Sequence, residues 1–213
     1  MIKGIRVCLF DFDGTLVDTM GSFADLAGAI IEREYGVPYN KARKQYMETS
    51  GIPFFQQLDV LFPSNSKNAD LANEFEARKK ESFFSESFSG DTVNALNDLK
   101  RRGIQIGISS NNFQELVDNF VKRESVEFDY ILGFRENFAK GKDHFKYIKE
   151  KSNCGLDELL FVGDSIKDAE KAYEYGIRFV AKLGTFSRED FINKFPNIIT
   201  IEKLNELLGI LQS

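Results

Sequence analysis

Short apolar runs alternate with helical patterns along most of this chain, and this alternation is what most constrains its fold. Strands separated by helices are typical of an α/β protein with a parallel sheet. The predicted strands are 5–10, 104–108, 128–132, 159–162, 177–180 and an edge strand at 198–201. Helices are expected at 91–102, closed by Gly103, from about 167 to Gly176, and finally over 202–211.

The stretch 16–89 differs from the rest, because it has helical spacing and no convincing strand pattern. We predict that it is a mostly helical insertion in a core formed by 1–15 and 90–213. Core packing is the simplest role for its many phenylalanines. They are Phe23, Phe54, Phe55, Phe62, Phe75, Phe83, Phe84 and Phe88.

Composition excludes several classes of function. The 213 residues carry a formal net charge of -5, which argues against nucleic acid or an anionic membrane surface as a partner. No stretch approaches the roughly 20 apolar residues of a membrane span, and the apolar run near the N-terminus is too short for a signal peptide. Two distant cysteines, Cys8 and Cys154, favour a reducing cytoplasm over a disulfide framework, and the single histidine, His144, nearly excludes a Ser-His-Asp triad.

A pair of carboxylates follows the first predicted strand directly. Asp11 and Asp13 are two residues apart, so in an extended chain their side chains point the same way. Ligands of open parallel sheets bind beyond the carboxyl ends of the strands, which is where this pair falls. Gly14 permits a sharp turn away from the sheet.

A second acidic cluster, with Asp164 and Asp168, follows the strand at 159–162. Two strands would therefore deliver four carboxylates to one edge of the sheet, where they would repel one another and raise one another's pKa. A hard divalent cation relieves this repulsion, and oxygen ligands with room for water suit Mg²⁺.

Three further residues fit the same edge of the sheet. Ser110 can donate a hydroxyl hydrogen bond to a phosphate oxygen, with the backbone N–H of Asn111 beside it, and Lys140 can supply a fixed positive charge. Taken singly, each residue has an ordinary role: Ser110 at a strand end, Lys140 on a solvated surface, and Asp164 or Asp168 at a helix cap. Together, at the ends of successive strands, they indicate a site.

This ordered set of motifs resembles the haloacid dehalogenase-like superfamily, and within it the phosphatase branch. Residues 11–18, Asp-Phe-Asp-Gly-Thr-Leu-Val-Asp, look like the family's first motif, and Ser110-Asn111 looks like its second. Lys140-Gly141 resembles the third motif and 163–168 the fourth. The resemblance implies a Rossmann-like core of five parallel strands, with a helical cap inserted after the first motif.

The resemblance also implies roles for these residues. Asp11 would attack phosphorus and form an aspartyl-phosphate, while Asp13 would protonate the leaving alcohol and then activate water. Mg²⁺ would be held by the Asp11 carboxylate, the Asp13 backbone carbonyl and Asp164, with Asp168 nearby or through water. The partner would be a small phosphorylated metabolite, with phosphoglycolate as a first guess.

Several alternatives stay open at this stage. Lys142 competes with Lys140 as the site lysine, Ser109 competes with Ser110, and His144 is expected at a helix surface or in packing rather than in catalysis. A phosphomutase would share every core residue. A phosphonate hydrolase fits less well, because it needs a lysine in the cap for its chemistry. A receiver domain lacks the Asp-x-Asp-Gly-Thr arrangement. A catalytically silent interaction protein also fits less well, because all four motif positions are filled here.

Overall fold

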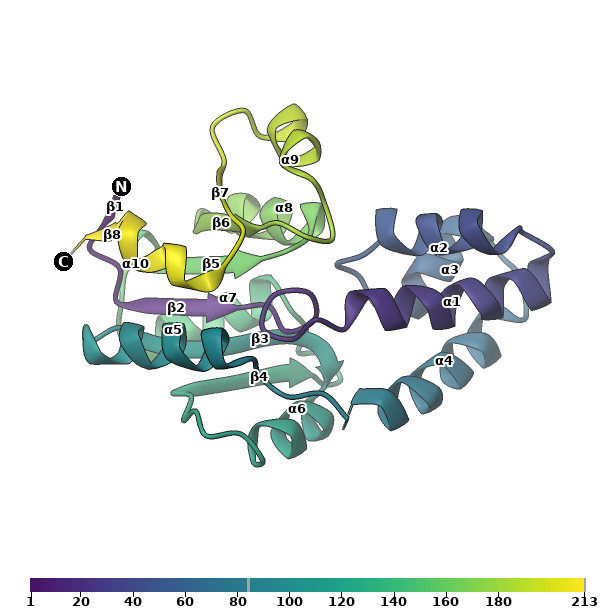
Figure 1. Cartoon of the computed structure of the whole chain (residues 1–213), viewed down its shortest axis with the longest axis horizontal. Coiled ribbons are helices and arrows are strands. Elements are labelled where there is room, and N and C mark those ends of the chain that lie inside the picture. The colour runs from purple at the N-terminus through teal and green to yellow at the C-terminus, as the bar shows by residue number, and fades with distance from the viewer. Residues whose placement is uncertain (84, 213) are drawn as a thin grey trace. The chain divides into compact units, whose positions relative to one another are not determined.

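The computed structural model describes residues 1–83 and 85–212. The chain divides into two compact units, one formed by Met1–Val17 with Ser87–Ser213 and the other by Asp18–Glu86 (Figure 1). The first unit thus begins before the second and resumes after it, so the second is an insertion in the sequence of the first.

A parallel sheet forms the centre of the first unit. Its strands, in spatial order, are β4 (Tyr130–Phe134), β3 (Gln105–Phe113), β2 (Val7–Phe10), β5 (Leu159–Gly163), β6 (Arg178–Lys182) and β7 (Ile199–Ile201). The described residues therefore form six strands in this sheet, one more than the five that the resemblance implied, because the edge strand at 199–201 pairs with β6. The predicted fold class, an α/β core with a mostly helical insertion, is confirmed.

Helices connect these strands and cover the sheet. They are α5 (Gly90–Arg101), α6 (Gln114–Val121), α7 (Lys142–Ser152), α8 (Ile166–Tyr175), α9 (Arg188–Lys194) and α10 (Leu207–Ile210), with short 3-10 turns at Leu156–Glu158 and Leu204–Glu206. An apolar cluster joins α7 and α8 to the sheet, with Phe145 and Ala169 packed against strand residues such as Leu9 and Phe161. The central strand β2 is fully buried along its whole length.

The end of the chain departs from the prediction of one helix over 202–211. A 3-10 turn and the one-turn helix α10 occupy most of it, and Leu211–Gln212 then forms strand β8. This strand pairs with β1 (Ile2–Lys3) in a small parallel sheet of its own. The prediction was wrong because this pairing with the N-terminus is tertiary and leaves no local pattern.

Strand β3 continues beyond the predicted end at residue 108. Its last part is the polar run Ser109, Ser110, Asn111 and Asn112 before Phe113, and its pairing with β4 reaches Phe113 through a register shift. The apolar pattern of the sequence ends at residue 108, but the strand continues to Phe113. The polar residues expected just after the end of the strand are therefore part of the strand itself.

Four helices make up the described part of the inserted unit: α1 (Met20–Tyr35), α2 (Tyr39–Glu48), α3 (Phe54–Leu61) and α4 (Asn68–Phe83). Phe75 lies at the centre of its core, with ring centroids 4.2 Å from Phe54 and 6.3 Å from Phe23. Phe62 stacks on Tyr35 at 3.8 Å. Core packing is therefore confirmed for Phe23, Phe54 and Phe75, whereas Phe62 is half-buried.

Three phenylalanines of that stretch need separate mention. Phe55 is 44% exposed, so the prediction of a core role was wrong for it. Phe88 belongs to the first unit, where its ring lies 5.3 Å from that of Phe120. Phe84 lies outside the described residues. Among the residues that are described, no helix has the length and apolar character needed to cross a membrane.

Candidate active site

Asp11 stands at the carboxyl end of β2, in the middle of the sheet. Its backbone N–H still donates to the carbonyl of Val162 on β5 at 2.8 Å, so the strand pairing fixes where the side chain begins. The chain then turns sharply at Gly14, whose φ of 76° lies in the left-handed region that favours glycine. The turn predicted from Gly14 is confirmed.

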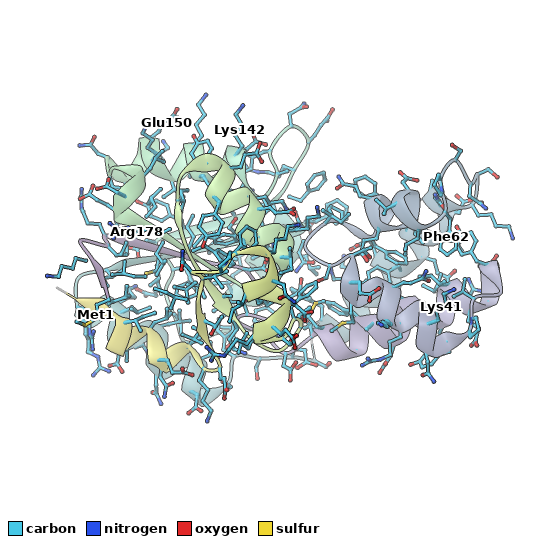
Figure 2. All side chains as sticks on the ribbon, turned by 90° about the horizontal axis from the view of Figure 1, so that it is seen from above. Met1, Lys41, Phe62, Lys142, Glu150 and Arg178 are labelled. Carbon is cyan, nitrogen blue, oxygen red and sulfur yellow. The ribbon has the colours of Figure 1, made fainter. Side chains whose placement is uncertain are left out.

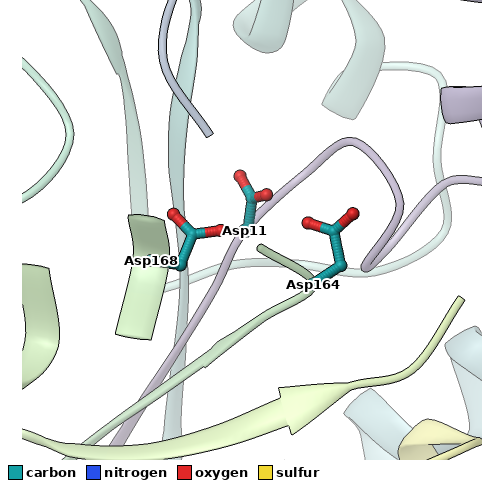
Figure 3. A group of neighbouring side chains, drawn as sticks. All are labelled: Asp11, Asp164 and Asp168. Atoms are coloured by element: carbon teal, nitrogen blue, oxygen red, sulfur yellow. The ribbon is translucent and has the colours of Figure 1, made fainter. Parts of the chain in front are cut away.

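Three of the predicted acidic residues come together at this edge of the sheet. Carboxylate oxygens of Asp11, Asp164 and Asp168 all lie within 4.8 Å of one another, and the three side chains are buried (Figure 3). Asp164 directly follows β5, and Asp168 lies in the first turn of α8. Gly163 makes this approach feasible, because a Cβ there would lie only 2.8 Å from the Cβ of Asp168.

Lys140 is the cation of this cluster. Its Nζ lies 2.8 Å from Oδ1 of Asp11 and 2.7 Å from Oδ1 of Asp168, and its side chain is 2% exposed. Lys142 instead begins α7 and points outward from its surface (Figure 2), where it lines a cavity of about 220 Å³ with Lys171, Glu174 and Tyr175. Of the two candidate lysines, the structure brings Lys140 to the carboxylates.

The charges of this cluster do not balance. Three buried carboxylates face one ammonium group, so full ionisation leaves two negative charges in excess. Burial, with the neighbouring Asp168, raises the pKa of Asp11 to about 6 against the pull of Lys140. Burial, followed by Asp11 and Asp168, raises the pKa of Asp164 well above its ordinary value. Burial alone would lower the pKa of Lys140, but Asp11 and Asp168 raise it.

Neighbouring hydroxyl groups orient two of the carboxylates. Ser165 is the N-cap of α8; its Oγ accepts from the backbone N–H of Asp168 and donates to Oδ2 of the same residue at 2.7 Å. The hydroxyl of Thr185 donates to Oδ2 of Asp164. Asp168 thus has a partner on each oxygen, Ser165 on one and Lys140 on the other, and Asp164 is held from the loop after β6.

Asp13 is oriented by a residue that the sequence analysis missed. Nδ2 of the buried Asn112 donates to Oδ2 of Asp13 at 2.9 Å, which links the first motif to the end of β3. The backbone N–H of Asn112 also donates to Oγ of Ser110 at 3.0 Å. The only sequence signal was the length of the polar run after the second predicted strand. Thr185 had no such signal.

The two candidate serines have different surroundings. Ser110 lies level with the residues that follow β2, because the register pairs Phe10 with Ile108 in the adjacent strand β3. Ser109 Oγ lies 2.9 Å from Nδ1 of His144, on α7. Neighbouring side chains of a strand point to opposite faces. Ser110 with the partly buried Asn111 therefore remains the better candidate for binding an anion.

These residues fit a hard divalent cation. The clustered ligand atoms are carboxylate oxygens, full ionisation leaves an excess of two negative charges, and burial raises the pKa of both Asp11 and Asp164, so a bound cation would favour their ionised forms. The side chain of Asp13 is outside the cluster, so only its backbone carbonyl remains as a candidate ligand. A carboxylate beside a cation, with a second carboxylate two residues along, can act as a nucleophile with an acid next to it.

Comparison with known proteins shows the family of this chain. The family model described as haloacid dehalogenase-like hydrolase matches residues 8–182. The chain belongs to this family, as its motifs predicted, and it is therefore a hydrolase by family. The first and fourth motifs both lie inside the matched region, as do all of the predicted site residues.

Two curated relatives match the chain over nearly its whole length. It is 22% identical to the phosphoglycolate phosphatase of Synechococcus elongatus, with 96% of each chain covered. It is 21% identical to pyrophosphatase PpaX of Bacillus velezensis, with 98% of this chain and 97% of the relative covered. One relative is named a phosphatase and the other a pyrophosphatase, and both names denote hydrolases that act on phosphate compounds.

The fold also matches solved structures. A haloacid dehalogenase-like hydrolase from Streptococcus pneumoniae superposes with a TM-score of 0.80 at 22% identity, covering 97% of this chain and 98% of that one. This likeness shows that the two proteins share a fold.

Proposed function

We propose that this protein is a Mg²⁺-dependent phosphatase that hydrolyses a small phosphate monoester through an aspartyl-phosphate on Asp11. The observation that carries the proposal is the buried Asp11 carboxylate, 2.8 Å from the ammonium of Lys140 and grouped with Asp164 and Asp168. A phosphoryl group brings negative charge, and catalysis of its transfer depends mainly on positioning and on charge neutralisation. The cluster supplies both.

The residues divide the reaction into two steps. An oxygen of Asp11 attacks phosphorus, the bond to the ester oxygen breaks, and Asp13 gives a proton to the departing alcohol. Asp13 then takes a proton from the water that attacks phosphorus, which frees Asp11 and releases inorganic phosphate. Asn112 holds the Asp13 carboxylate during both transfers through its 2.9 Å hydrogen bond. Ser110, the N–H of Asn111 and Lys140 bind the phosphoryl oxygens.

The metal ligands we propose are the carboxylates of Asp11 and Asp164 with the backbone carbonyl of Asp13. Asp168 holds Lys140 and stays nearby or binds through water, since both of its oxygens already have partners. When bound, Mg²⁺ would neutralise the charge of the phosphoryl group as it transfers.

The substrate class we propose is a small phosphorylated metabolite. Phosphoglycolate is the first compound to test, since one relative is named for it, and pyrophosphate is the second, from the other relative. A phosphomutase would use the same residues but would pass the phosphoryl group to a sugar. Release of inorganic phosphate in step with substrate loss supports the phosphatase. Two buried free cysteines, Cys8 and Cys154, support the cytoplasm as its compartment.

The replacement Asp13→Asn tests the two-step mechanism. With p-nitrophenyl phosphate, whose leaving group needs little protonation, we expect a burst of about one nitrophenol per site followed by steady turnover about 10²–10⁴-fold slower than wild type. The burst arises because the second step still needs a base. Intact-protein mass spectrometry should show the phosphoryl adduct. Steady turnover at the wild-type rate would contradict the role of Asp13.

Mg²⁺ should stabilise the protein, and more strongly at pH 8 than at pH 5. In the folded protein, burial raises the pKa of Asp11 to about 6. The metal-free fold therefore becomes less stable as the pH rises from the pKa of an aspartate in the unfolded chain through about 6. Mg²⁺ binds the ionised carboxylates, so its binding restores the stability that the metal-free protein loses at higher pH. At about 100 times Kd, binding contributes about 2.7 kcal/mol, or roughly 5–10 °C in Tm for a chain of this size. Differential scanning calorimetry with and without Mg²⁺ measures this shift, and an equal or smaller shift at pH 8 would refute the cation site.

A further inference from the structure

The only histidine of the chain joins two parts of the site. His144 lies in the first turn of α7 and is fully buried, and its Nδ1 is 2.9 Å from Oγ of the fully buried Ser109 on β3. Ser109 directly precedes Ser110, and His144 follows Lys140 by four residues. One hydrogen bond therefore connects the strand of the second motif to the helix that follows the third. Of the two roles expected for His144, at a helix surface or in packing, the structure shows packing.

The same imidazole also contacts the chain before Lys140. Its ring centroid lies 4.6 Å from that of Phe138. Phe138 is fixed in turn by two backbone hydrogen bonds with Arg135, at 2.9 and 3.0 Å. His144 thus packs against one end of the segment 138–144 and itself forms the other end. Lys140 lies between these ends.

Two further hydrogen bonds stabilise the same segment. The backbone N–H of Ala139 donates to Oδ2 of Asp143 at 3.0 Å, and the N–H of Phe145 donates to the carbonyl of Gly141 at 2.9 Å. Gly141 has a φ of 111°, a conformation that side-chain-bearing residues rarely adopt. The backbone around Lys140 is therefore a tight turn, and the ring of His144 on α7 packs against its first residue, Phe138.

A buried polar pair is a costly way to fill this space. An apolar pair would pack between β3 and α7 without the need for a hydrogen bond, whereas a buried donor left without a partner costs free energy. Burial, with the charge of Lys140 adding to it, lowers the pKa of His144 to about 3, so the ring stays neutral and its hydrogen bond stays directional. A directional bond fixes one orientation of two elements, which apolar contacts do less well.

We infer that Ser109 and His144 are positioning residues, which hold the segment 138–144 so that Lys140 reaches Asp11 and Asp168. Neither residue is in the carboxylate cluster, so their effect on the reaction acts through Lys140. The inference rests on the proposed function, because the role of Lys140 is to neutralise the phosphoryl group. A small displacement of such a charge lowers turnover, because the reacting groups must be held in the right geometry.

The test compares His144→Leu, Ser109→Ala and His144→Asn with the control Ile148→Ala, a buried residue one turn further along α7. In Mg²⁺ with p-nitrophenyl phosphate, we expect His144→Leu and Ser109→Ala to lower kcat by about 10- to 100-fold with little change in KM. His144→Asn keeps a polar group near the position of Nδ1 and should recover most of the loss. The control should lower Tm but leave kcat near the wild-type value.

A second measurement does not depend on activity. Lys140 is protected by its ion pairs, and brief acetylation with acetic anhydride, followed by mass spectrometry, measures that protection. His144→Leu should make Lys140 react at least several times faster than it does in wild type or in Ile148→Ala. Equal protection and equal kcat in all variants would overturn the inference. A wild-type protein that hydrolyses no monoester would overturn the proposed function instead, and the acetylation rates would still decide the positioning role.

Discussion

Replacing Asp11 by Asn is expected to abolish turnover, lowering kcat by at least about 10³-fold. Asparagine has nearly the same shape as aspartate but cannot attack phosphorus, so no aspartyl-phosphate forms. Phosphate release measures the loss, and mass spectrometry checks for the missing adduct. Glu150→Gln, which removes one exposed charge from α7 (Figure 2), is the matched control and should turn over at the wild-type rate.

The same variant should fold at least as stably as wild type without metal. Asp11 has a pKa raised to about 6, so above that pH its ionised form costs the folded state free energy that neutral asparagine does not. Lys140 keeps its ion pair with Asp168 at 2.7 Å. The Tm at pH 8 should therefore stay equal or rise, while the gain from Mg²⁺ shrinks. Normal turnover in a folded Asp11→Asn protein would eliminate the proposed nucleophile.

Replacing Lys140 by Met is expected to damage both activity and stability. Methionine fills similar volume but leaves three buried carboxylates without a cation, and breaking a buried ion pair in this way costs about 3–5 kcal/mol. For a chain of this size that cost corresponds to a fall in Tm of roughly 6–20 °C. Because Lys140 also neutralises the phosphoryl group, kcat should fall by about 10²–10³-fold.

The chain offers its own control for this variant. Lys142 lies two residues away, is exposed and points outward, so Lys142→Met should change stability by no more than about 0.5 kcal/mol and leave kcat unchanged. Thermal melts and steady-state kinetics on both variants make the comparison. Mg²⁺ should restore part of the Tm of Lys140→Met, because it supplies the positive charge that was removed. Equal effects of the two substitutions would contradict the assignment of Lys140.

The amino-acid sequence was enough to predict the architecture of this protein and the family to which it belongs. Apolar runs, helical periods and turn glycines are local patterns, and they predicted the strands of the sheet and the position of Asp11, Asp13, Asp164 and Asp168 at strand ends. The convergence of such residues follows from topology, since parallel strands place their carboxyl ends at one edge. The length of β3 and the chain's final residues were misjudged, because strand pairing decides both, and so were the core role of Phe55 and the placement of Phe88 in the insertion.

Contacts between residues that are far apart in the sequence could be identified only from the tertiary structure. Lys140 and Lys142 have the same chemistry in the sequence, but the turn at Gly141 leaves the first among buried carboxylates and the second at the start of an exposed helix face. Asn112 reaches Asp13, Thr185 reaches Asp164 and Ser109 reaches His144 across 99, 21 and 35 residues of chain. A hydrogen bond between such distant residues leaves no periodic trace, because packing and not local propensity brings them together.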